Sequence, residues 1–329
     1  MHPILISGSC KCETAKDHTI LIQTVLDAAI NNQNLTRLQV ISLASDGESH
    51  CGKALSNLTY VAPLALSSPI YDQLIHLKLM DYFVGPDDIT ADKDYKHIFK
   101  QLHNALLHEN GCVIHGIHVT RTLISKHLKD SGWTDTHINH ILNPTDKQDI
   151  VLMYSLLKDL WSLLLADPLS STLTYIKVHE ALCLYGNLSY NLIFPYICIN
   201  LSLSEQLEHL STAAHLVLTP YVDDNMRSQF IPTPLFVNIS IMIKNAYFCV
   251  AKAKINHPNH PFFLTLLVTN QLESLFGILR TMVGNDTNLD ILQLALHITS
   301  TTEVSTILAK HPKWDRGLCQ LCLPTVSKK

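Results

Sequence analysis

The feature that most constrains the fold of this sequence is a succession of helical periods through its middle. Apolar residues recur there at three- and four-residue spacing, which gives a helix one apolar face. These periods run through residues 120–129, 148–164, 204–217 and 234–253. Proline-containing tips at 143–144, 167–168, 232–234 and 257–258 mark their connections. We therefore predict an all-α region in the middle of the chain.

The first part of the sequence has a different pattern, in which short apolar runs alternate with helical periods. Such alternation is typical of an α/β arrangement. The pattern predicts strands at 4–7, 38–44 and 84–91 and helices at 19–30, 69–80 and 93–107. The last of these helices should bury Tyr95, Ile98, Phe99, Leu102 and Leu106.

A third pattern covers residues 269–301. Thr269 or Asn270 can cap a helix whose apolar residues recur at helical spacing, and Glu273 then lies in its first turn. A second helix is expected from about residue 288, with Leu292 and Leu296 on one face. Asn270 followed three residues later by Glu273 also fits a capping box, in which the glutamate only satisfies an orphan amide. Local sequence alone favours that simpler role.

Composition limits the classes of function. The chain has 329 residues and 47% hydrophobic residues, enough for one large or two ordinary domains. Charged residues make up only 16% and the formal net charge is −4, whereas nucleic-acid binders usually carry a basic surface. The uncharged stretch 181–204 contains Gly186, Asn187, Asn191 and Pro195, so we do not expect it to span a membrane.

The first residues lack a basic segment followed by a long apolar one, so we expect no secretory signal and an intracellular protein. Nine cysteines in such a compartment are expected to be free thiols.

Three sequence motifs within residues 272–317 resemble those of known proteins: LESLFG, LRTMVGND and LAKHPKWDRG. Residues 269–301 resemble the closing motif of DNA transposases of the P-element type, including their THAP-domain-associated relatives. They are still more similar to a group of fungal transposase-like proteins. The resemblance covers nearly the whole chain. Asn270 stands where the transposase pattern usually has an aspartate.

The resemblance implies an RNase H-like core interrupted by a large all-α insertion, hence a mostly helical α/β fold. It implies three segments: the N-terminal part of the core at 1–110, the insertion at 111–262 and the helices that close the core at 263–329. We expect the first core strands, with the first catalytic aspartate, to be missing ahead of this sequence. It further implies Mg²⁺ as cofactor, and GTP by analogy with the family, with no residues assigned to GTP.

Two carboxylates match the family's catalytic residues. Asp46 follows a predicted buried strand, at the edge of a sheet where ligands gather, and matches the second catalytic aspartate. Glu273 matches the last catalytic acid. Hard oxygen ligands such as these suit Mg²⁺ in phosphodiester cleavage, although two alone hold it weakly. The alternative for Asp46 is a simple Asp-Gly turn.

The segment 92–104 carries a second match. Asp94, His97, Lys100 and Asn104 fall on the family's Asp-x-x-His-x-x-Lys-x-x-Arg-Asn pattern, with His103 in place of the arginine. We assign these four residues, with Asn270, a supporting role. Lys96 and Arg280 are candidates for contacts with the DNA backbone, which position DNA without reading its sequence. The alternative is a solvated helix face with no such role.

Zinc and nucleotide motifs find little support. Three groups of residues suggest zinc ligands: Cys112, His115 and His118; His137 and His140; and Cys319 and Cys322. None of these groups has a second well-spaced cysteine pair. No phosphate-binding loop motif and no nucleophile elbow are present.

Cysteine or histidine occupies positions 12, 51, 103, 319 and 322, where the similar fungal proteins lead us to expect arginine. Single C-to-T changes convert arginine codons beginning with CG in this way. We therefore interpret the chain as a degenerate copy of a mobile-element protein, nuclear if functional. Its ancestral activity is Mg²⁺-dependent DNA cleavage and strand transfer, impaired here. The alternative is a non-enzymatic helical scaffold that binds a protein partner or a second copy of itself.

Overall fold

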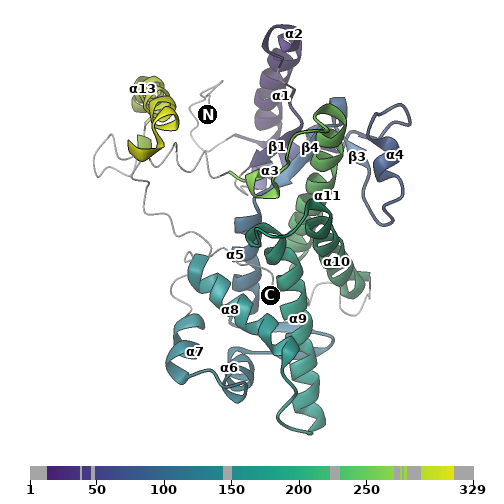
Figure 1. Ribbon diagram of the computed structural model, residues 1–329, viewed down its shortest axis with the longest axis vertical. Helices are drawn as coiled ribbons and strands as arrows, with labels where there is room; N and C mark the ends of the chain where they lie inside the picture. Colours follow the sequence, from purple (N-terminus) through teal and green to yellow (C-terminus); the bar gives the residue numbers. More distant parts are fainter. Residues whose placement is uncertain are drawn as a thin grey trace. The chain divides into compact units, whose positions relative to one another are not determined.

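The computed structural model describes residues 13–37, 39–45, 49–143, 150–222, 230–269, 275, 278–279 and 290–314. Within these ranges the protein is mostly helical, with few strands (Figure 1). The chain divides into two compact units. The first unit comprises Met1–Tyr71, Asp81–Asp92 and Val268–Gln320. The second comprises Asp72–Met80, Lys93–Leu267 and Leu321–Lys329, and we call it the helical unit.

In the first unit, helix α1 (Ala15–Asn31) packs against α3 (Ser49–Thr59). A capping box opens α1: the Thr14 hydroxyl accepts from the amide of Asp17, and the Asp17 carboxylate accepts from the amide of Thr14. Short strands pair in this unit, β2 (Ala62–Pro63) with β3 (Phe83–Val84) and β1 (Ser42–Ser45) with β4 (Thr90–Lys93).

The helical unit is arranged around α9 (Leu173–Ile197), most of whose residues are buried. The helices in contact with it are α5 (Tyr95–Leu106), α6 (Arg121–Asp130), α8 (Ile150–Ser162) and α10 (Leu203–Val222). Helix α11 (Thr233–Asn256) packs against α5 and α10. In Figure 1 these helices run from blue (α5) through teal (α8 and α9) to green (α11).

Two tyrosines of α9, Tyr185 and Tyr196, hold α5 against it. The hydroxyl of the fully buried Tyr185 donates to the carbonyl oxygen of Leu102 at 2.7 Å. About two turns nearer the start of α5, the Tyr95 ring stacks on Tyr196 with centroids 4.2 Å apart, and Phe99 meets the edge of the same tyrosine. The apolar face of α5 is therefore committed to the interior, and its polar face is directed away from α9.

The remaining elements are short or terminal. An antiparallel hairpin joins β5 to β6, and His115 and Gly116 form its turn with positive φ angles. The bounds are β5 (Cys112–Ile114), β6 (Ile117–Val119), α2 (Gln33–Thr36), α4 (Tyr71–Leu74), α7 (Asp135–Ile141), α13 (Ile291–Lys310) and the 3₁₀ turns Pro86–Asp88, Leu163–Leu165, Leu264–Leu266 and Pro312–Trp314.

Most of the helices predicted from the sequence are confirmed. The predictions at 19–30, 93–107, 120–129, 148–164, 204–217 and 234–253 correspond to α1, α5, α6, α8, α10 and α11. All five apolar residues predicted to face inward from 93–107 are buried. The helix expected from residue 288 begins at Ile291, with Asp290 and Gln293 forming a capping box.

Several local predictions are wrong. The helix expected at 69–80 shrinks to the single turn of α4, which ends at Leu74, and Leu79 farther along takes a positive φ of 71°, outside helical geometry. The strand expected at 84–91 is divided, because Gly85 and Pro86 begin a 3₁₀ turn between β3 and β4. The strand at 38–44 is reduced to β1, which is half-exposed rather than buried. The hairpin of β5 and β6 was not predicted.

The predicted RNase H-like core is not established by the structure. Strands in the described ranges form three separate two-stranded sheets, so the mixed sheet of such a core stays a prediction. The predicted strand at 4–7 lies outside the described residues. The three-segment division at 110 and 262 also stays a prediction.

One helix in the described part of the chain, α11, is long and apolar enough to cross a membrane. Its sequence carries Lys244 and Lys252, both buried, and the helix is in contact with α5 and α10. Buried helices at the centre of a protein pass the same test of length and composition. We interpret α11 as such a helix.

Gly186 sets how closely α8 and α9 approach. A Cβ atom at this position would lie 2.6 Å from the carbonyl oxygen of Leu160 and 2.9 Å from the Cα of Trp161. These are backbone atoms, so they can yield only if the two helices separate.

We expect Gly186→Ala to destabilise the protein by about 1–2 kcal/mol, because the cost of overpacking exceeds the gain in helix propensity of about 1 kcal/mol. Urea unfolding followed by circular dichroism measures the change. The control is Glu180→Ala, an exposed position on the same helix, which should alter stability by less than about 0.5 kcal/mol. Equal stability of Gly186→Ala and the parent would contradict this account of the helix crossing.

Candidate functional site

The two predicted catalytic carboxylates, Asp46 and Glu273, lie outside the described residues, as do Asn270 and Arg280. Two neighbours of Glu273 are described: Leu275 and Leu279 are helical and buried. Their four-residue spacing is that of the apolar face predicted for this helix. The separation of Asp46 from Glu273 therefore stays a prediction.

The second predicted group, by contrast, lies entirely on or beside α5. Asp94 is the N-cap of this helix, and its Oδ1 accepts a hydrogen bond of 2.8 Å from the amide of Lys96. The residue is only 2% exposed. Burial and the adjacent Asp94 carboxylate raise the pKa of Tyr95 to about 12. A capping role accounts for an aspartate at position 94 without any catalytic function.

The other members of the group share the polar side of α5. His97, Lys100 and Asn104 are half-buried and follow one another at helical spacing, with Lys96 at the border of this surface. On the same side, the Oε1 of Gln101 accepts a hydrogen bond of 3.2 Å from Asn238 of α11. The structure thus brings the predicted supporting residues onto one face. We call Lys96, His97, Lys100 and Asn104 the α5 polar face.

His103, which stands at the arginine position of the family pattern, points to the interior instead. It is buried, its Nδ1 lies 3.3 Å from the Oδ1 of Asn104, and its Nε2 has no hydrogen-bond partner. Burial lowers the pKa of His103, and the nearby Arg121 guanidinium lowers it further. Arg121 itself donates to the carbonyl oxygen of Leu107 at 2.6 Å, beyond the end of α5. A neutral, enclosed His103 is not suited to contact a phosphate.

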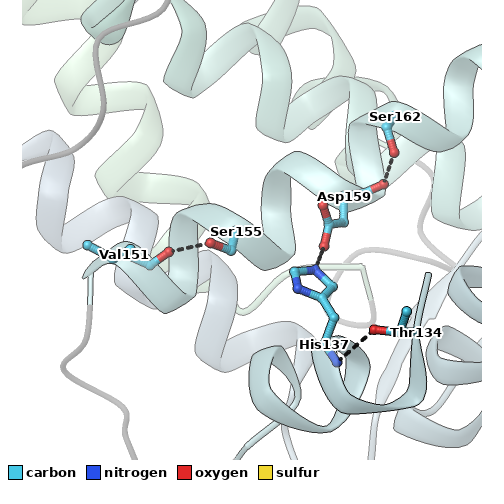
Figure 2. A network of polar contacts seen from close by, with 6 residues as sticks. All are labelled: Thr134, His137, Val151, Ser155, Asp159 and Ser162. Carbon is cyan, nitrogen blue, oxygen red and sulfur yellow. Dashed lines mark hydrogen bonds and ion pairs between the residues drawn. The ribbon is translucent and has the colours of Figure 1, made fainter.

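A polar pair that the sequence did not predict joins α7 to α8 (Figure 2). The Nε2 of His137 lies 2.6 Å from the Oδ2 of Asp159, whose side chain is almost fully buried. Burial raises the pKa of Asp159, and the contact with His137 partly opposes that change. Trp133 stacks on the His137 ring, with centroids 4.7 Å apart.

The His137–Asp159 pair has the geometry of a base and its orienting acid, but neither neighbouring serine completes a triad. The hydroxyls of Ser155 and Ser162 donate to the main-chain oxygens of Val151 and Asp159, as Figure 2 shows. We therefore assign the pair a structural role.

The histidines considered for zinc do not gather with other ligands. Across the described ranges, no group of three or more His, Cys, Asp or Glu side chains could hold a metal ion. His137 is engaged with Asp159, and Cys112 is a buried free thiol. Cys319 and Cys322 lie outside the described residues.

No protein-family model and no curated protein sequence matches the chain. Among solved structures, the chain is similar to the Drosophila P element transposase of a strand transfer complex, with a TM-score of 0.58 and 16% sequence identity. The similarity covers 84% of this chain and 62% of the transposase chain. The two share a fold, and this chain spans less than two thirds of the transposase's length.

The cap at Asp94 yields a quantitative expectation. Asp94→Ala should destabilise the protein by about 1 kcal/mol, because the amide of Lys96 loses its acceptor at the start of α5. Asp94→Asn keeps an accepting oxygen and should cost only a few tenths of that value. Chemical denaturation of both variants measures the difference. Equal losses would show that the carboxylate's charge, rather than its capping bond, stabilises this position.

Proposed function

We propose that this chain derives from a DNA transposase of the P-element type. The observation that carries the proposal is the shared fold over 84% of the chain. A second observation supports it: the residues at the Asp, His, Lys and Asn positions of the family's Asp-x-x-His-x-x-Lys-x-x-Arg-Asn pattern lie at the start and along one side of α5, with His103 at the arginine position.

The α5 polar face is the proposed contact with the DNA backbone. Lys96 and Lys100 provide positive charge, and Asn104 provides an amide that can donate to a phosphate oxygen. Arg280 is proposed to add a further contact. Contacts of this kind hold DNA without reading its sequence, and the net charge of −4 predicts that they hold it weakly.

For the chemistry, we propose Asp46 and Glu273 as the ligands of Mg²⁺ in the ancestral cleavage and strand-transfer reaction. Carboxylate oxygens have the right chemistry for this ion, but Mg²⁺ requires six ligands, so two side chains leave most positions to water and DNA. Asn270, in place of an aspartate, removes a further charge. We therefore propose that catalysis is impaired in this chain. GTP use is proposed on the family resemblance alone.

The alternative is a non-enzymatic scaffold for a protein partner. A specific observation favours it: the connection between α8 and α9 exposes Leu164, Leu165, Leu169 and Leu173, with Leu165 93% exposed. Contiguous exposed leucines are typical of protein-binding surfaces. The two functions differ in their dependence on salt.

A DNA titration separates them. We expect the full chain to bind duplex DNA weakly in fluorescence anisotropy, with an affinity that falls steeply as salt rises. Replacing Lys96 and Lys100 together by glutamine should reduce the slope of log K against log salt by about 1.8, at 0.9 for each lost phosphate contact.

The matched control replaces Lys158 and Lys177, exposed lysines of α8 and α9, by glutamine. That variant should keep the slope of the parent. An affinity that does not change with salt, or a slope reduced equally by both variants, would overturn the proposed interface and favour the scaffold.

A further inference from the structure

A pair of buried histidines lies between α6 and α9. His127 of α6 is 1% exposed and His179 of α9 is 8% exposed. Their ring centroids are 5.8 Å apart, and the His127 ring also packs on Tyr175, with centroids 4.1 Å apart. The contact between these two helices therefore includes two imidazole rings, a kind of side chain that titrates more readily than other aromatic side chains.

The hydrogen bonds of the pair suit neutral rings. The Nε2 of His179 lies 3.1 Å from the carbonyl oxygen of Ala166, so this nitrogen carries a hydrogen that it donates. The Nδ1 of His127 is buried and has no hydrogen-bond partner. A proton added to that nitrogen would meet no acceptor, and its positive charge would have left water without compensation.

The charges around His127 come from three helices. On α6 itself, Lys126 opposes protonation and Asp130 favours it, while His179 opposes it from α9. The Asp130 carboxylate also accepts a hydrogen bond from the hydroxyl of Tyr175. From α7, which also packs on α6, His137 is engaged with Asp159, and Asp135 is paired with Lys129 at 2.8 Å; His140 of α7 is exposed.

We propose that this histidine pair is an acid-sensitive latch: a proton on His127 releases α6 from α9 while the rest of α9 stays folded.

The direction of the effect follows from linkage. Burial is the largest cause that lowers the pKa of His127, from its ordinary 6.5 to about 4, with His179 and Lys126 adding to it. The neutral ring therefore stabilises the closed state fully above pH 6.5, and this stabilisation is lost progressively as the pH falls from 6.5 to about 4. Opening exposes His127 to water and restores its ordinary pKa. From pH 7.5 to pH 5, the equilibrium constant for opening should rise about 25-fold.

Hydrogen exchange of the full chain, followed by mass spectrometry at pH 7.5 and 5.0 and corrected for intrinsic rates, tests the latch. Peptides covering 121–130 should lose protection by about 25-fold at pH 5.0. The reference is residues 182–193 of α9, a buried segment without histidine, whose protection should change less than about threefold. Equal changes in the two segments, or no change in 121–130, would overturn the proposal.

His127→Phe keeps a ring against Tyr175 but cannot take a proton. This variant should show less than about threefold pH dependence over 121–130, whereas the control His140→Phe, at an exposed position of α7, should open like the parent. Acid-induced opening that persists in His127→Phe would overturn the latch. Should His127→Phe fail to fold, NMR titration of the histidine rings in the parent decides: a pKa of His127 below about 5.5 supports the proposal, and a higher value overturns it.

Discussion

The close approach of α9 to its neighbours is the constraint on which the helical unit depends. Gly186 lets the backbone of α8 approach that of α9 closely. The preceding residue, Tyr185, connects α9 to α5 through the hydrogen bond of its hydroxyl. These two adjacent residues thus position α8 and α5 on different sides of α9. Because the Tyr185 hydroxyl is buried, its hydrogen bond to Leu102 also satisfies a polar atom that would otherwise be costly in the interior.

The placement of the α5 polar face follows from that constraint. Phe99 and Leu102 are held against the aromatic residues of α9, so the rotation of α5 about its own axis is fixed. His97, Lys100 and Asn104 must then lie on the opposite side. Packing, rather than any interaction among the polar residues, brings them onto one surface, while the preceding Asp94 serves the helix as its cap.

Helix α5, which has one polar side, could be predicted from the sequence, whereas α9 could not. The alternation of polar and apolar residues in α5 gave both its bounds and its buried face. Helix α9 is buried on most of its surface, so its apolar residues show no helical period, and Gly186 and Pro195 interrupt it further. The hairpin of β5 and β6 is only three residues long on each side, too short for a pattern. The apolar run at 69–80 has a helical period, but the helix ends at Leu74 and the residues that follow form turns.

Sequence reasoning reached the candidate site through motif residues and missed the contacts that tertiary structure creates. Nothing in the local sequence connects Asp159 with His137, or His127 with His179, because each pair is joined only when two helices pack together. The position of His103 illustrates the converse. The family pattern places His103 where an arginine is expected, but the packing of α5 directs the His103 side chain to the interior.

The place of α11 in the chain bears on how the protein is made. Among the described residues of the helical unit, this long apolar helix is the last large element, and α5 and α10, which it contacts, both precede it. Synthesis at about 5–20 residues per second lets earlier segments leave the ribosome first. We therefore expect α5 and α10 to be available for packing when α11 emerges. This order shortens the time during which the apolar side chains of α11 are exposed to aggregation or to the membrane-targeting machinery of the cell.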